Sequence, residues 1–218
     1  MRIAIATVQV PFMKGGAEIL VNMLEEELVK RGHKVDIVSV PFKWYPPERL
    51  IDSMNIWRMV DLSEAEGMKI DKVIAVKFPA FYVRHSNKVL WMMHQHRQAY
   101  DLWNTKYGDL QNLENGEEIR DFIQNCDNKY LQEARHIYTI ARTTSERLEK
   151  YNGIYSTVLY HPPLNYEKLC YESNGDYMFY ASRINTIKRQ RLLVEAARYF
   201  KSGARVVIAG GGVQQEID

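Results

Sequence analysis

The sequence opens with RIAIATV at residues 2–8, AEILVNMLEEELVKR at 17–31 and VDIVSV at 35–40. The first and third segments are short and rich in apolar and β-branched residues, a composition that favours strands. The second segment places apolar side chains at helical spacing, and Gly32 follows it as a stop signal. Together the three segments predict a β-α-β unit with parallel strands and a right-handed crossover.

The same alternation of short apolar runs and longer periodic segments continues as far as residue 160. It predicts the α/β class and a Rossmann-like, doubly wound parallel sheet. The expected strands lie at 72–76, 88–93, 137–140 and 156–160, and the expected helices lie at 117–135 and 144–151. Residues 41–60 are aromatic and contain three prolines, which predicts an irregular segment. Such a segment serves as a lid, as a loop facing an acceptor, or as cover for the core.

A break in this pattern at His161-Pro162-Pro163 predicts the end of a first domain, which we place at 1–163. The polar stretch 164–175 is expected to be a linker. A second Rossmann-like domain, expected at 176–218, is incomplete. Its predicted elements are strands at 177–181 and 205–209 with a helix near 188–200 between them.

Composition excludes several classes of protein. Of the 218 residues, 46% are hydrophobic and 26% are charged, so the chain can bury a sizeable core. The net charge of +2 is too small for a general nucleic-acid scaffold, and we expect no nucleic-acid partner. Cys126 and Cys170 stand alone, which indicates free thiols in a reducing compartment. No apolar run of about 18 residues occurs, so we expect a cytoplasmic protein, either free or peripheral at the inner face of the membrane.

A pair of glycines, Gly15-Gly16, lies where the first strand turns into the first helix. Bare backbone N–H groups at a helix N-terminus can hold a phosphate or a sugar hydroxyl. The pattern is neither the dinucleotide fingerprint nor a phosphate-binding P-loop. The alternative is that a tight turn between strand and helix simply requires glycine.

Four blocks of sequence extend this observation, and in their content and order they resemble family 4 glycosyltransferases, which have the two-domain GT-B fold. The resemblance covers nearly the whole chain. The blocks are 15–18 with 31–35, then 90–101, then 144–148 with 160–163, and finally 180–184, Lys188, 192–196 and 206–210.

The resemblance implies an enzyme of carbohydrate biosynthesis that transfers a sugar from a nucleotide-diphosphate sugar, with retention, in a cleft between two domains. It implies no metal and no other cofactor. Arg183 and Lys188 match the basic pair that binds the donor diphosphate, and Gly15, Gly16 and Gly211 are expected at the same group. Two fixed cations oppose the charge that grows on the departing diphosphate. The alternative for the pair is a solvated surface, and Ser182 departs from the family, which normally has glycine there.

His94 follows an apolar strand, and the resemblance places a catalytic histidine in this region, near the reacting carbon or the sugar hydroxyls. A buried structural histidine is one alternative. A metal pair with His96 is another, although no third ligand stands at a convincing spacing. The resemblance also makes Glu18, Arg97 and Asp101 candidate contacts to the acceptor or the sugar, and an Arg–Asp structural pair is the alternative for the last two.

The glutamate pair that holds the donor sugar in this family has no counterpart here. Glu18 and Glu26 have a similar spacing, but both lie on the first helix of the opposite domain, so we reject them as that motif. We therefore expect a truncated chain that does not turn over alone. The acceptor is a glycan, a lipid or a small molecule. Two alternatives remain open: a half-enzyme completed through its unfinished second domain by a partner chain or a second copy, and a non-catalytic module that binds a nucleotide or sugar.

Overall fold

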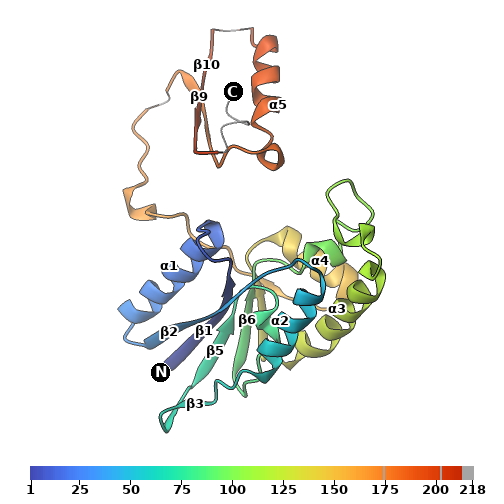
Figure 1. Cartoon of the computed structure of the whole chain (residues 1–218). Helices are drawn as coiled ribbons and strands as arrows, with labels where there is room; N and C mark the ends of the chain where they lie inside the picture. Colours follow the sequence, from blue (N-terminus) through green and yellow to red (C-terminus); the bar gives the residue numbers. More distant parts are fainter. Residues whose placement is uncertain (174, 202, 213–218) are drawn as a thin grey trace. The chain divides into compact units, whose positions relative to one another are not determined.

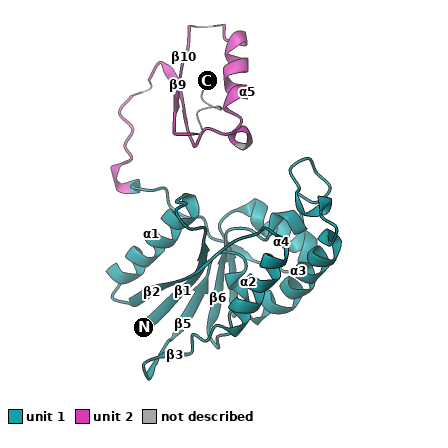
Figure 2. Cartoon of the chain, viewed as in Figure 1, with its two compact units in different colours: residues 1–166 teal, residues 167–218 magenta. Residues whose placement is uncertain are grey.

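The computed structural model describes residues 1–173, 175–201 and 203–212. The chain divides into two compact units, Met1–Tyr166 (unit 1) and Glu167–Asp218 (unit 2), which Figure 2 shows in different colours. The expected linker at 164–175 includes this division. Residues 213–218, the end of the expected second domain, lie outside the described residues.

Unit 1 is built on a six-stranded sheet in the order β2-β1-β5-β6-β7-β8 (Figure 1). All neighbouring strands are parallel, and Ile5 of the first strand pairs with Ile37 of the second. The strands are β1 (Arg2–Gln9), β2 (Lys34–Pro41), β5 (Lys72–Ala75), β6 (Lys88–Met92), β7 (His136–Thr139) and β8 (Thr157–Val158). The expected α/β class with a Rossmann-like parallel sheet is confirmed. Two very short strands, β3 (Glu64–Ala65) and β4 (Met68–Lys69), form a separate hairpin.

Helices cover both faces of this sheet (Figure 1). On one face, α1 (Gly16–Lys30) packs Leu20 and Val21 against Ile5. On the other face, α2 (Glu48–Met59), α3 (Gly116–Tyr130) and α4 (Arg142–Asn152) enclose the larger of two apolar clusters. No helix within the described ranges is both long enough and apolar enough to cross a membrane.

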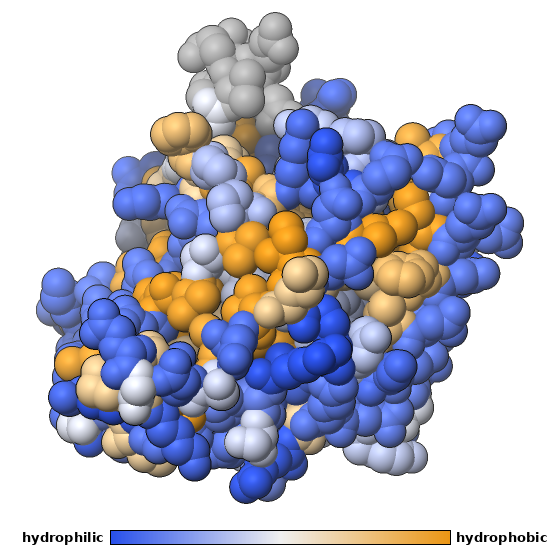
Figure 3. Space-filling model, turned by 60° about the horizontal axis from the view of Figure 1, so that its bottom comes forward, coloured by the Kyte–Doolittle hydropathy of each residue, from blue (hydrophilic) through white to orange (hydrophobic). Residues whose placement is uncertain are grey.

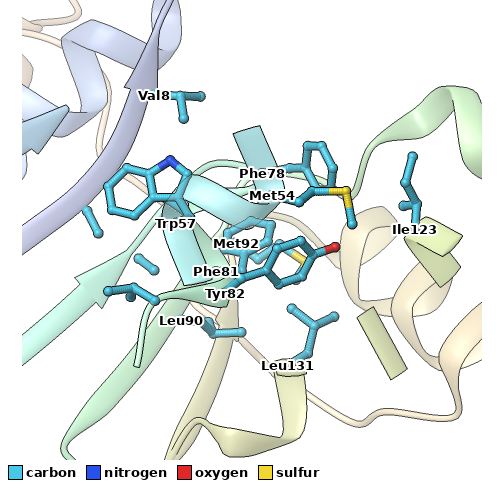
Figure 4. Close-up of a cluster of buried hydrophobic side chains, with 14 of the residues drawn as sticks. Val8, Met54, Trp57, Phe78, Phe81, Tyr82, Leu90, Met92, Ile123 and Leu131 are labelled. Carbon is cyan, nitrogen blue, oxygen red and sulfur yellow. The ribbon is translucent and has the colours of Figure 1, made fainter. Parts of the chain in front are cut away.

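The larger cluster is the main core of unit 1, and Figure 4 shows its central side chains. Trp57 of α2 meets Phe81 and Tyr82, which come from the 3-10 helix η1 (Ala80–Tyr82) between β5 and β6. All three side chains are almost completely buried. In Figure 4 the Tyr82 hydroxyl points away from Trp57 and toward the side where Ile123 of α3 lies.

The prediction of an irregular segment at 41–60 is wrong for most of its length, because α2 occupies Glu48–Met59. Pro47 immediately precedes the helix, where a fixed φ favours helix initiation. Leu50, Met54 and Trp57 then recur at helical spacing and are buried against the sheet. The helix therefore covers the core, and only residues 42–47 are irregular.

Unit 2 contains two parallel strands, β9 (Tyr177–Ala181) and β10 (Arg205–Ala209), with the short helix α5 (Gln190–Ala196) between them. Both strands have the predicted bounds, whereas the helix is shorter than predicted and continues as the 3-10 helix η7 (Ala197–Tyr199). Among the residues of unit 2 whose side chains the structure describes, Gln190 alone is buried. Figure 3 shows one face of the chain, where apolar side chains are exposed in several patches between hydrophilic ones.

Candidate functional site

The sheet of unit 1 has a point at which the order of its strands reverses. β1 lies between β2 and β5, so the chain leaves β1 on one side and returns on the other. In open parallel sheets, ligands bind outside the carboxyl ends of the strands at such a point. Here those ends lead into the loops that follow β1, β5 and β6. These loops carry the glycine pair, Lys77 and His94, respectively.

The glycine pair begins α1 without adopting a backbone that only glycine can adopt, because neither residue is among those with positive φ. A Cβ placed on Gly16 would meet no atom of the described residues within 4 Å. On Gly15 it would come only to 3.5 Å from Glu18 Oε2, an ordinary contact. The turn therefore does not require glycine at either position. What the two glycines provide is open space above a helix N-terminus.

Glu18 connects this turn to the next strand. The Gly15 backbone N–H donates to Glu18 Oε2 at 2.8 Å, which is one half of a capping box. Lys77 Nζ, from the end of β5, donates to Glu18 Oε1 at 3.0 Å. Burial raises the pKa of Glu18, but the hydrogen bond and charge of Lys77 outweigh burial and leave that pKa below its usual value. Glu18 is thus ionised and lines a hollow of about 470 Å³ beside β1.

His94 is held in a defined tautomer. Its Nδ1 lies 2.6 Å from the carbonyl oxygen of Gln95, and a carbonyl oxygen only accepts hydrogen bonds, so Nδ1 carries the hydrogen. Burial lowers the pKa of His94, the Gln95 carbonyl opposes this, and the charges of Arg97 and Arg147 lower it further. The imidazole is therefore neutral near pH 7, and its Nε2, which carries no hydrogen, remains as an acceptor.

A second hollow, of about 340 Å³, is lined by His94, His96, Lys77 and the aromatic rings of Phe42 and Phe78. The structure brings the two histidines to the same hollow, as their alternating positions predict. Within the described residues, no three His, Cys, Asp or Glu side chains are grouped so as to hold a metal ion.

His96 has a packing role in this hollow. Its ring lies 5.0 Å from that of Phe78, centroid to centroid. Burial, with a smaller contribution from His94, lowers the pKa of His96 to about 4. A neutral ring stacked on a phenyl group supports the wall of the hollow rather than exchanging protons near neutral pH.

Arg97 and Asp101 form the side-chain pair that the sequence left as one of two interpretations. Arg97 Nη2 donates to Asp101 Oδ2 at 2.6 Å, and Arg147 Nη1 of α4 lies 3.8 Å from Asp101 Oδ1. Burial raises the pKa of Asp101, but the two arginines outweigh burial and lower it. This cluster joins the loop after β6 to α4 and keeps positive charge near His94.

In unit 2 the expected diphosphate ligands lie on the loop that follows β9, again at the carboxyl end of a parallel strand. Arg183 and Lys188 are both exposed there. Gln190 holds the loop by donating to Ser182 Oγ at 2.6 Å and to the Arg183 carbonyl at 2.8 Å. The Ile184 N–H donates to the carbonyl of Gly211 at 2.9 Å.

The glycines after β10 differ in what their surroundings require. A Cβ on Gly210 would overlap the carbonyl oxygen of Ser182, so close packing requires that glycine. A Cβ on Gly211 would meet no atom of the described residues within 4 Å. The expected diphosphate contact at Gly211 therefore has open space above it, as at Gly16.

Sequence reasoning missed Lys77, Phe42 and Gln95. The rule that singled out His94, a polar residue immediately after an apolar strand, also finds Lys77 because β5 ends at Ala75. Phe42 carries no such signal, since it lies in an aromatic segment where its neighbours Trp44 and Tyr45 are exposed.

Comparisons with protein-family models and with curated proteins give no match to this chain. Its function is therefore argued from the residues and the geometry described above.

Proposed function

We propose that this chain belongs to a retaining glycosyltransferase that uses a nucleotide-diphosphate sugar, and that the hollow at His94 receives a sugar. The observation that carries the proposal is the neutral His94, whose Nε2 carries no hydrogen, in a hollow that it shares with Lys77. Lys77 also binds Glu18, which caps the glycine turn. Sugar hydroxyls donate hydrogen bonds to an acceptor such as this Nε2. The four sequence blocks that resemble family 4 glycosyltransferases support the same assignment.

In the proposed reaction the bond from the anomeric carbon to the diphosphate breaks, and a bond from that carbon to an acceptor oxygen forms on the same face. The acceptor hydroxyl loses its proton to the departing diphosphate, so atoms and charge balance without a redox step. Arg183 and Lys188 stabilise the charge on the diphosphate, which is largest as it departs. His94 orients the sugar through one hydroxyl. We expect EDTA to leave binding and transfer unchanged.

Binding is the sharpest test, because it does not depend on turnover by this chain alone. Isothermal titration calorimetry of the full chain with UDP-glucose, GDP-mannose and ADP-glucose should show saturable binding of at least one. Arg183→Ala and Lys188→Ala should each weaken it about 10- to 150-fold, the range for hydrogen bonds to charged groups. Lys201→Ala, another exposed lysine of unit 2, is the matched control and should have no effect.

Two results would contradict the proposal. One is absence of binding for a panel that covers the common bases and hexoses. The other is a loss in Arg183→Ala and Lys188→Ala no larger than in Lys201→Ala, which would make the pair a solvated surface. Binding that persists without transfer to any acceptor, even with a complete second domain, would favour the non-catalytic binding module.

The half-enzyme is a second candidate, and the exposed apolar side chains of unit 2 favour it. Phe179 on β9 and Leu192 and Val194 on α5 are each more than half exposed. Parallel strands are normally covered on both faces, so a chain that supplies such cover would complete this unit. If a second copy does so, sedimentation velocity should show concentration-dependent association that Phe179→Asp abolishes. A monomer at all concentrations would contradict completion by a second copy.

A further inference from the structure

Asp127 of α3 is a carboxylate that is only 1% exposed. Its Oδ1 accepts from the Tyr82 hydroxyl at 2.6 Å, and its Oδ2 accepts from the Tyr100 hydroxyl at 2.7 Å. These are the only side-chain donors to Asp127 within the described part of the chain. A buried carboxylate is costly unless its oxygens are hydrogen-bonded, so the two hydroxyls are essential partners.

The two tyrosines come from the two loops that line the hollow at His94. Tyr82 ends η1, in the loop after β5 that also carries Lys77. Tyr100 follows the 3-10 helix η2 (Arg97–Ala99), in the loop that carries His94 after β6. One carboxylate on α3 therefore fastens both loops. The proposed sugar site does not use Asp127 directly.

A chain of hydrogen bonds leads from Tyr100 to His94. Asn152, the last residue of α4, donates from Nδ2 to the Tyr100 hydroxyl at 3.2 Å. Its Oδ1 accepts from Nε2 of Gln95, whose side chain is buried. The Gln95 carbonyl in turn accepts from His94 Nδ1. Asn152 Nδ2 donates also to Oδ1 of Asn128 at 2.6 Å, so Tyr100 is one of two groups that orient the Asn152 amide. The last step runs through Gln95 itself, from its side-chain amide to its main-chain carbonyl.

We propose that Asp127 is a positioning residue for His94. Through Tyr100, Asn152 and Gln95 it holds the main-chain carbonyl of Gln95 where that oxygen accepts the Nδ1 hydrogen, which leaves Nε2 as the acceptor for a ligand. The identity of that ligand rests on the proposed function. The tautomer of His94 does not, because it is a property of the chain without ligand.

Nitrogen-15 NMR of the imidazole rings in the full chain reads this tautomer directly, and His94→Gln identifies the signal among the six histidines. Wild type should show Nδ1 protonated and Nε2 unprotonated. Tyr100→Phe removes the hydroxyl that joins Asp127 to Asn152 and should move His94 toward a mixture of tautomers. Tyr82→Phe, the matched control, removes the other hydroxyl on the same carboxylate and should leave the His94 tautomer unchanged.

Affinity supplies a second readout. Tyr100→Phe should weaken nucleotide-sugar binding by up to about tenfold, the effect of one hydrogen bond, and Tyr82→Phe should not. Should Tyr100→Phe fail to fold, Asn152→Ala cuts the same path at the end of α4 and should give the same tautomer change. Equal responses of His94 in the Tyr82 and Tyr100 variants, or no response in either, would make Asp127 a structural anchor only. A tautomer change as expected, with no nucleotide sugar bound by wild type, would overturn the proposed function and leave the positioning role standing.

Discussion

Units 1 and 2 use the same local plan, parallel strands joined by a helix, yet they bury their side chains very differently. In unit 1 the strands β1, β5 and β6 have residues with no exposed surface, among them Ala6, Val73 and Leu90. In unit 2 the corresponding positions of β9 are exposed, with Phe179 61% accessible. Helices lie on both faces of the six-stranded sheet of unit 1, whereas α5 is the only α-helix within the described residues of unit 2.

This contrast shows that the location of a strand or helix and its stability depend on different features of the chain. Hydrophobic periodicity is enough to locate the strands of unit 2. Stability requires, in addition, that other elements cover the apolar faces, because burial of apolar surface is the main favourable contribution to folding. Two strands and one short helix cannot supply that cover for one another.

Hydrogen exchange should show the largest difference between the units. Amides of β1 and β5 exchange only through global unfolding of unit 1, while those of β9 and β10 exchange through a much less costly local opening. We expect at least about a thousandfold slower exchange in unit 1. Limited proteolysis should cleave within 164–175 and release a folded amino-terminal fragment. A single cooperative unfolding transition, with equally slow amide exchange in both units, would contradict this difference in stability.

Two phenylalanines, one in each unit, differ in burial as the two units do. Phe81 is 1% exposed and Phe179 is 61% exposed. Phe81→Ala should lower the free energy of unfolding of unit 1 by about 3–5 kcal/mol, because it leaves a cavity in the core. Phe179→Ala should change the stability of the chain by no more than about 0.5 kcal/mol. Urea denaturation followed by tryptophan fluorescence measures the first, because all four tryptophans lie in unit 1. Urea denaturation followed by hydrogen exchange of the β9 and β10 amides measures the second.

A large loss of stability in Phe179→Ala would show that the exposed face of β9 is covered in solution. Sedimentation velocity of the same samples would then distinguish self-association from a monomer.

The elements of the fold were predictable where apolar residues recur in a simple period. The strands at 177–181 and 205–209 have their predicted ends. The helix α2 was missed because Pro46, Pro47 and the aromatic residues before it indicate irregular structure. Its own signal, Leu50, Met54 and Trp57 at successive turns, begins only after them.

The site was predictable where a polar residue follows a strand, and not where partners come from distant helices. Asp127 is the clearest case. It occupies the position after Ile119 and Ile123 on the apolar side of α3, where a carboxylate in a hydrophobic stripe indicates a buried polar partner. The sequence shows that such a partner is needed, but only the structure identifies it as Tyr82 and Tyr100.

Lowering the pH should reduce the free energy of unfolding of unit 1, because His96 becomes protonated. Burial lowers the pKa of His96 to about 4 from 6.5, so the unfolded chain binds the proton first as pH falls. The stability that neutral His96 contributes is complete above about pH 6.5 and is lost as pH falls toward 4, a difference of about 3 kcal/mol. His96→Phe should flatten this part of the curve of unfolding free energy against pH.

Asp127 should give the free energy of unfolding the opposite pH dependence, over nearly the same pH range as His96. Burial raises its pKa to about 6 from 3.8, although the two tyrosine hydroxyls lower it, so the folded chain holds the proton longer. Its contribution is complete below about pH 3.8 and is lost as pH rises through 6. In Asp127→Asn, stability should therefore rise more steeply with pH between 4 and 7 than in wild type. Parallel curves for the two proteins would contradict the burial of an ionisable group at this position.

The most direct test of the account is the response of His94 to a sugar. The nitrogen-15 signal of His94 Nε2 in the full chain is followed while a nucleotide sugar, or the matching nucleoside diphosphate without sugar, is added. If a sugar binds at His94, the signal should show a saturable shift with the nucleotide sugar, a much smaller one with the diphosphate, and no shift at the exposed His161 in either titration. An unchanged His94 signal at saturating nucleotide sugar would contradict the proposed sugar site.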